Sequence, residues 1–333
     1  MPTPRTMTSR TMTALQQFQR LLPPDRLRDF TPVVLLLALC VIIQAREPGF
    51  ATLGTLSVIL ADMASLFVLA AGVTFVILLG GIDLSIQAVA SLGSVVLAQA
   101  LPYLGPAAFL AVIAVGLLFG VISGVVHVRL RVPSFVATLA TGGVAAGIAL
   151  LLAGGRTITI GEDSRHYTAW LNGSFLGMPS AFVVAAGIGA VGFVVLRYTR
   201  FGRYSIAVGA GEPAAAAAGI NVDRVKIMAF AASGMLAAVA GAILGCRMSS
   251  GSPALANQQL LPAIAAVIVG GTAITGGLGG MLRTAMGALI IAVVQLGMTF
   301  VGINIFAQQT VFGLMLVAAV AVTIDRSKLA VIK

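Results

Sequence analysis

Charged residues are scarce in this sequence, and their scarcity excludes a soluble globular protein. Asp, Glu, Lys and Arg make up 9% of the 333 residues, whereas hydrophobic residues make up 59%. A surface exposed to water needs charged residues at about 25% of the composition. Because no polar segment is long enough to form a soluble domain, the composition indicates an integral membrane protein.

Lysine and cysteine are rarer still, and each shortage excludes a kind of site. Neither Lys226, Lys328 nor Lys333 follows the Gly-x-x-x-x-Gly that cradles phosphates, so the chain has no phosphate-binding loop. Cys40 and Cys246 have no CxxC or metal-ligand spacing, and we expect both to be packing residues. We therefore expect no ATPase site, no metal and no cofactor on this chain.

Motifs of membrane enzymes are missing too. The sequence has no HExxH and no GxSxG, and its two histidines, His127 in a basic turn and His166, fall on opposite sides of the expected membrane. The formal net charge is +10, yet the basic residues form short groups between apolar segments. That placement argues against nucleic-acid binding.

What the sequence has in abundance is apolar segments, which predict an all-α polytopic membrane protein with about ten transmembrane helices. Spanning the bilayer takes roughly 20 residues, so the first and eighth segments are the shortest fits. The predicted spans cover 31–45, 57–79, 86–101, 106–126, 134–153, 180–196, 227–245, 262–276, 284–301 and 308–324.

The distribution of cations predicts the orientation. With both ends in the cytoplasm, only Arg46, Arg156, Arg165 and Arg247 of the 20 Lys and Arg residues would lie outside, as the positive-inside bias requires. We expect a basic, partly amphipathic cytoplasmic segment over 1–29, a transmembrane domain over 30–325 and a cytoplasmic tail over 326–333. The first span is expected to be uncleaved.

The polar segment 197–226 contains a predicted short helix with signals at both ends. Pro213 suits a first helical turn, Glu212 lies at the positive end of the dipole, and Gly219 can end the helix. A small-sided helix between two spans suits insertion into a groove on a partner, although a plain polar loop with a helical turn is the alternative. The candidate docking residues are Arg203, Glu212, Pro213, Ala214, Ala215, Ala216, Ala217, Ala218, Gly219 and Ile220.

Two segments, 76–85 and 266–275, each place a Gly pair after an apolar run, which is typical of broken helices and internal repeats in transporters. Asp83 is interpreted as a cap for a helix that starts at Leu84, or as part of a permeation path. For Asp62 an interhelical hydrogen bond and a path position remain open. The candidate pathway residues are Asp62, Gly80, Gly81, Asp83, Ser85, Gly270, Gly271 and Thr272.

The loop 154–179 is the longest polar segment on the other side of the expected membrane. It carries Glu162, Asp163, Arg165 and a single tryptophan, Trp170. An ordered loop with an interfacial tryptophan and a contact with an external partner are both compatible with this composition.

The run GRYSIAVGAGEPAAAAAGINVDRVKI (202–227) resembles the coupling loop of permease subunits of ABC importers of the ribose and monosaccharide group. LAAGVTFVILLGGIDLS and IAAVIVGGTAITGGLGGMLRTAMGALI resemble further stretches of the same family, in its usual order. This chain departs from the family's pattern at Gly211, at Ala215 to Ala217, and at Gln258 to Pro262, where an acidic pair is usual.

The resemblance implies a subunit of a bacterial inner-membrane importer and a set of partners. An ATP-binding subunit carrying ATP and Mg would dock inside, a second permease copy or paralogue would pair with the chain, and a periplasmic binding protein would deliver the solute. The solute implied is a monosaccharide such as ribose. Branched-chain amino acids, nucleosides or a signalling sugar derivative are alternatives, and a secondary carrier or channel is a more distant one.

Overall fold

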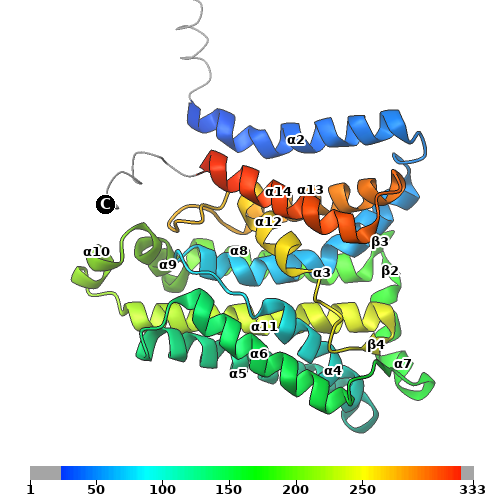
Figure 1. Ribbon diagram of the computed structural model, residues 1–333, viewed down its shortest axis with the longest axis horizontal. Coiled ribbons are helices and arrows are strands. Elements are labelled where there is room, and N and C mark those ends of the chain that lie inside the picture. Colours follow the sequence, from blue (N-terminus) through cyan, green and yellow to red (C-terminus); the bar gives the residue numbers. More distant parts are fainter. Residues whose placement is uncertain (1–23, 324–333) are drawn as a thin grey trace, which may run out of the picture.

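The computed structural model describes residues 24–323 of the chain. Most of the helices lie roughly along one common direction (Figure 1). The predicted segment over 1–29 falls largely outside the described residues, and the predicted tail over 326–333 falls wholly outside them.

Each of the ten predicted spans coincides with an apolar helix, with ends that differ by several residues. The first helix begins earlier than predicted, at Pro24, and the eighth ends earlier, at Val269 rather than at 276. The helices are α2 (Pro24–Arg46), α3 (Leu53–Ile77), α4 (Ile86–Leu104), α5 (Ala108–Arg129), α6 (Ser134–Ala153), α8 (Ser180–Tyr198), α11 (Val222–Met248), α12 (Leu260–Val269), α13 (Met281–Phe300) and α14 (Ile305–Thr323).

Length and composition allow 6 of the described helical segments to cross a membrane. One of these, Ile86–Arg129, contains both α4 and α5, which are joined by the 3-10 turn Gly105–Ala107 and pack side by side. Pro32–Arg46, Leu260–Val269 and Phe306–Ala321 are shorter apolar helices. The predicted class, a polytopic all-helical membrane protein, is confirmed.

The two ends of the bundle carry different structures. The short helices α9 (Arg200–Ala210) and α10 (Glu212–Ala217) lie between α8 and α11 at one end, here called the α10 end (Figure 1). At the other end, here called the α7 end, lie α7 (Glu162–Ala169), the turn η2 (Trp170–Asn172) and four two-residue strands. Strands β1 (Ile158–Thr159) and β4 (Ser250–Gly251) pair antiparallel, as do β2 (Ser174–Phe175) and β3 (Met178–Pro179).

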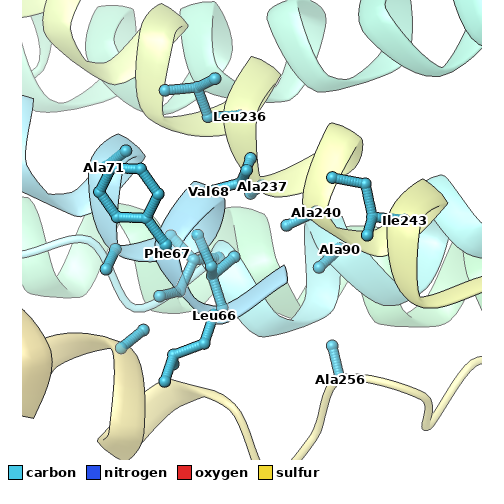
Figure 2. Packing of buried hydrophobic residues seen from close by; sticks show 14 of the residues in the cluster. Leu66, Phe67, Val68, Ala71, Ala90, Leu236, Ala237, Ala240, Ile243 and Ala256 are labelled. Atoms are coloured by element: carbon cyan, nitrogen blue, oxygen red, sulfur yellow. The ribbon is translucent and has the colours of Figure 1, made fainter. Parts of the chain in front are cut away.

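Helices α3 and α11 form the centre of the bundle. Helix α3 packs against α8, α11, α12 and α13, and from Met63 to Ile77 all of its residues are buried. A helix that is apolar all round is expected in such a position, because no face of it needs to meet water. Figure 2 shows this core, in which α3, α4, α11 and one loop contribute Leu66, Phe67, Val68, Ala71, Ala90, Leu236, Ala237, Ala240, Ile243 and Ala256.

Glycines allow α11 to approach its neighbours closely. A Cβ built on Gly120 of α5 would overlap the carbonyl oxygen of Phe230, and one built on Gly234 would overlap Gly116 in return. Small residues of this kind let backbones pack together in membranes, where burial of apolar surface gives no drive for association. The high glycine content, 39 residues, is thus used in part to join α5 to α11.

We expect Gly241→Ala to destabilise the bundle, because its Cβ would overlap the backbone of Ala90 in α4. Overpacking a tight contact costs about 1–3 kcal/mol, and backbone atoms have little freedom to give way. Gly147→Ala in α6 is the matched control, since nothing lies within 4 Å of its added Cβ. Thermal unfolding in detergent should show a lower melting temperature for the first variant only, and equal melting of both would contradict the proposed contact.

Two non-helical stretches pass through the bundle, and hydroxyl groups satisfy their backbone. Between α3 and α4, the N–H of Ile82 donates to Ser134 Oγ at 3.1 Å and that of Leu84 to Thr138 Oγ1 at 3.0 Å. Between β4 and α12, the N–H of Ala256 donates to Ser91 Oγ at 3.0 Å. In an apolar surrounding each unsatisfied group would cost several kcal/mol, so these hydroxyls are what permits irregular backbone here.

Candidate functional site

The polar segment 197–226 folds into two helices rather than the single short one expected. Helix α10 matches the prediction, and Gly219 lies two residues after its end with φ of +82°, the left-handed conformation that glycine favours. Helix α9, which the sequence analysis missed, starts after Thr199, whose hydroxyl accepts a hydrogen bond from Gly202 N at 3.3 Å. Its signal was present in the helical spacing of Phe201, Ser205 and Val208.

Helices α9 and α10 share a small apolar core with the start of α11. Val208, Ala215, Val222 and Val225 are buried together. Leu79, Phe201 and Ile220 pack around them, and Phe201 stacks on Phe75 of α3 with ring centroids 5.9 Å apart. This core holds α10 against the body of the protein, since a six-residue helix has no stability of its own.

The remaining alanines of α10 and its C-terminal turn form an exposed face. Only Ala215 of the run is buried, at 4% exposure, while Ala214, Ala216, Ala217 and Ala218 are exposed. Glu212, at the first position of the helix, forms an ion pair with Lys226 of α11 at 2.7 Å. Arg203 is exposed on α9, where its Nη1 donates to the carbonyl of Tyr198 at 3.3 Å.

Helix α9 also contacts both Gly-rich breaks, which are the stretch 78–85 between α3 and α4 and the stretch 270–280 between α12 and α13. A Cβ on Gly209 would overlap the carbonyl oxygen of Leu78 and lie against the backbone nitrogen of Gly277. Those two groups are themselves joined, because Gly277 N donates to Leu78 O at 2.9 Å. The backbone of α9 is therefore in direct contact with the backbone of each break.

One candidate pathway residue, Gly80, brings the two breaks together. Gly80 has φ of +76° and faces the carbonyl of Thr275, while Gly271 has φ of +99°. Gly270 packs against the backbone of Arg283, and Gly81 against Val76. The two segments that the sequence suggests as repeats thus meet in space, although a true internal repeat stays a prediction.

Three polar residues of this set are buried. Asp83, Ser85 and Thr272 are 1%, 2% and 0% exposed, so in this conformation their side chains contact protein instead of an open passage. The Thr272 hydroxyl accepts a bond from Gly280 N at 3.4 Å, within the same loop.

The expected cap at Asp83 is wrong in its details, because α4 starts at Ile86 and not at Leu84. Asp83 Oδ1 accepts hydrogen bonds from Ser85 N at 2.9 Å and Ser85 Oγ at 2.6 Å, while Oδ2 accepts one from Ser233 Oγ of α11 at 2.7 Å. The carboxylate thus orders the break before α4 and ties it to α11. The placement of His127 in a basic turn between spans is likewise wrong, since it lies in the last turn of helix α5.

Asp62 lies apart from the rest of the set. It precedes the end of α3 by fifteen residues, or about 22 Å of helix at 1.5 Å per residue. Its Oδ1 forms an ion pair with Arg247 Nη2 of α11 at 2.6 Å, and Arg247 Nη1 donates to the carbonyl of Ala61 at 2.8 Å. Asp62 therefore has an interhelical partner, Arg247, as one of its two interpretations predicted.

Asp62 also lines a pocket that the sequence analysis missed. The pocket has a volume of about 310 Å³ and is lined by Asp62, Gln295, Leu296, Thr299, Ile303 and Gln308. These residues come from α3, from the end of α13 and from the start of α14 with the turn before it. Because three separate elements contribute, no local spacing in the sequence could have identified the group.

Residues 55–320 match the family described as "Branched-chain amino acid transport system / permease component". The chain is 35% identical to the ribose import permease of Haemophilus influenzae over 88% of its length and 91% of the relative's. It is 36% identical to the ribose import permease of Bacillus subtilis, over 89% and 92% respectively.

A further relative, the L-arabinose transport system permease of Escherichia coli, is 34% identical over 60% of each chain. No solved structure matches this chain. The match runs from the first turn of α3 to the last turn of α14 and includes both breaks and helices α9 and α10. The chain therefore belongs to the family of permease components described for branched-chain amino acid transport systems, and it is a multi-pass membrane permease.

Proposed function

We propose that this permease is the translocating subunit of a bacterial ABC importer for a monosaccharide such as ribose or arabinose. Its relatives include two ribose permeases and one L-arabinose permease, which supports the choice of solute. The proposal includes ten membrane crossings by the ten apolar helices, with the N- and C-termini and the α10 end in the cytoplasm of a bacterium with an inner membrane. The cation distribution supports that orientation, because Arg197, Arg200, Arg203, Arg224 and Lys226 all gather around α10.

The observation that carries the proposal is the exposed alanine face of α10. It projects from the bundle on a small apolar core, has no large side chains, and is connected through α9 to both breaks. A protruding helix with small side chains fits a groove on another protein. We assign that groove to an ATP-hydrolysing subunit that holds ATP and Mg. A second permease copy or a paralogue and a periplasmic solute-binding protein complete the proposed assembly.

In this mechanism the ATPase subunits move the segment from Glu212 to Ile220 when they close on ATP. The rigid contact between Gly209, Leu78 and Gly277 passes the displacement from α9 to the two breaks. The backbone at Gly80, Gly81, Gly270 and Gly271 then rearranges, and the buried groups of Asp83, Ser85 and Thr272 become part of the opened path. We propose the breaks as the element that switches between two states, because they lack a continuous helix that would resist the change.

Ala216→Glu should abolish sugar-dependent ATP hydrolysis and transport. Docking would remove the introduced carboxylate from water without giving it a cation to pair with, which is energetically costly. The measurement is uptake of labelled D-ribose and L-arabinose by the reconstituted complex, together with its ATPase rate. Ala51→Glu, at an exposed position in the turn before α3, is the matched control and should transport normally. If the Ala216→Glu variant showed wild-type uptake and ATPase rates, α10 would not be the helix that docks on the ATPase subunit.

A second candidate solute, a branched-chain amino acid, is favoured by the description of the matched family alone. The same uptake assay distinguishes the two solutes. Transport of leucine, isoleucine or valine, with no transport of pentoses, would replace the sugar in the proposal while leaving the docking role of α10 unchanged.

A further inference from the structure

We propose that the pocket beside Asp62 is a binding site for the hydroxyl groups of an uncharged sugar, on the membrane side opposite the docking helix. This inference rests on the proposed function, because the direction of import makes the α7 end the side from which the solute arrives. Helix α11 starts next to α10 and ends one residue after Arg247, so the pair of Arg247 with Asp62 lies toward the α7 end.

The polar groups of the pocket match the chemistry of a sugar. Gln295 and Gln308 carry amides that both donate and accept, Thr299 carries a hydroxyl, and Asp62 is an acceptor. A sugar hydroxyl also both donates and accepts, so it can bond to any of them. Leu296 and Ile303 supply apolar wall against which the C–H groups of a sugar ring can pack.

The charge of the site favours a neutral ligand. The carboxylate of Asp62 is compensated by Arg247 at 2.6 Å, so the pair has no net charge. The Asp62 side chain is 46% exposed, against 20% for Arg247. Oδ1 holds the guanidinium, and within residues 24–323 no hydrogen bond is made by Oδ2, which leaves an acceptor for a ligand in the pocket.

The two glutamine amides of the pocket differ in their hydrogen bonding: that of Gln308 is bonded to protein, and that of Gln295 is available to a ligand. Gln308 is 4% exposed and fixed in place, with its Nε2 at 3.3 Å from Thr299 Oγ1 and from the carbonyl of Ile303. The Gln295 side chain has no hydrogen-bond partner in the part of the chain that the structure describes, although it lies on a membrane helix and lines the pocket. Gln295 is half-buried and faces the pocket, so its amide can bond to a ligand there.

Cysteine protection tests the site. In a Cys40→Ala background of the intact permease–ATPase complex in nanodiscs, Gln295→Cys should react with a membrane-impermeant maleimide, and D-ribose or L-arabinose should slow the reaction. A sugar present at twice its Kd slows labelling roughly threefold, by the factor 1 + [L]/Kd. Cys246 is buried, and the background without the added cysteine measures any label on it.

Phe175→Cys is the matched control, at a 59% exposed position on the hairpin of the α7 end and outside the pocket. Its labelling should be the same with sugar as with isosmotic betaine. Thr299→Val supplies a second readout. The Thr299 hydroxyl donates to the backbone carbonyl of Gln295 at 3.1 Å and accepts from Gln308 Nε2, which leaves it one acceptor position for a sugar hydroxyl. Loss of that one hydrogen bond should raise the KM for uptake of the transported sugar about tenfold.

The outcomes separate this inference from the proposed function. If the wild-type complex transports neither a pentose nor a hexose, the proposed function fails, and the sugar site fails with it. If the wild type transports a sugar but that sugar does not protect Gln295→Cys, the pocket inference alone is refuted. A cysteine at 295 that stays unlabelled without sugar would show that a second copy or lipid fills the pocket, and would equally overturn it.

Discussion

Gly209→Ala is expected to reduce transport by about 5- to 150-fold while leaving the ATPase subunit bound to the permease. The added Cβ would overlap the carbonyl oxygen of Leu78 and lie against the nitrogen of Gly277, and neither backbone group can turn away without breaking the 2.9 Å bond between them. The contact would have to separate. Overpacking of this kind costs about 1–3 kcal/mol, and every 1.4 kcal/mol between two states changes their ratio tenfold.

The measurement pairs sugar uptake with the basal ATPase rate and with co-purification of the two subunits. Gly211→Ala is the matched control, because its Cβ would meet only Ala214 Cβ at 3.9 Å and its backbone φ of 178° is open to any residue. Uptake at the wild-type rate in Gly209→Ala would show that α9 does not transmit movement to the breaks. Loss of the ATPase subunit from the variant would mean that Gly209 acts in docking instead.

Asp83→Ala is expected to lower the thermal stability of the permease more than Gly241→Ala or Gly209→Ala does. The variant leaves Ser85 N, Ser85 Oγ and Ser233 Oγ without their acceptor in a buried site. Each unsatisfied buried group costs about 1–3 kcal/mol, so the total loss is several kcal/mol. The break between α3 and α4 would lose both its internal order and its bond to α11.

Asp83→Asn separates the structural role of this residue from a role in transport. The amide keeps the oxygen that accepts from Ser85, and its NH₂ group can donate to Ser233 Oγ, which then acts as an acceptor. We expect a loss of about 1 kcal/mol, seen as a small drop in melting temperature. A stable Asn variant that fails to transport would assign the carboxylate charge to the pathway, whereas a variant as unstable as Asp83→Ala would refute the hydrogen-bond explanation.

The sequence predicted more of the fold than of the site. Apolar segments separate clearly from polar ones in a membrane protein, and for that reason the ten helices were located to within several residues. Helix α10 was also predicted, since Pro213 and Gly219 are local signals whose effect does not depend on distant contacts. Helix α9 was missed because Arg200, Arg203 and Tyr204 gave the segment a polar composition that concealed its apolar face.

The sequence by itself determined the membrane class, the helices and the short alanine helix, because periodicity, hydropathy and capping act within a few residues along the chain. Only the tertiary structure decided which polar groups meet. Asp62 pairs with Arg247 across 185 positions, Asp83 bonds to Ser233 across 150, and the two Gly breaks join through Leu78 and Gly277. Such pairings depend on how helices cross in space, and helix crossing is set by packing of small residues from distant segments rather than by any local pattern.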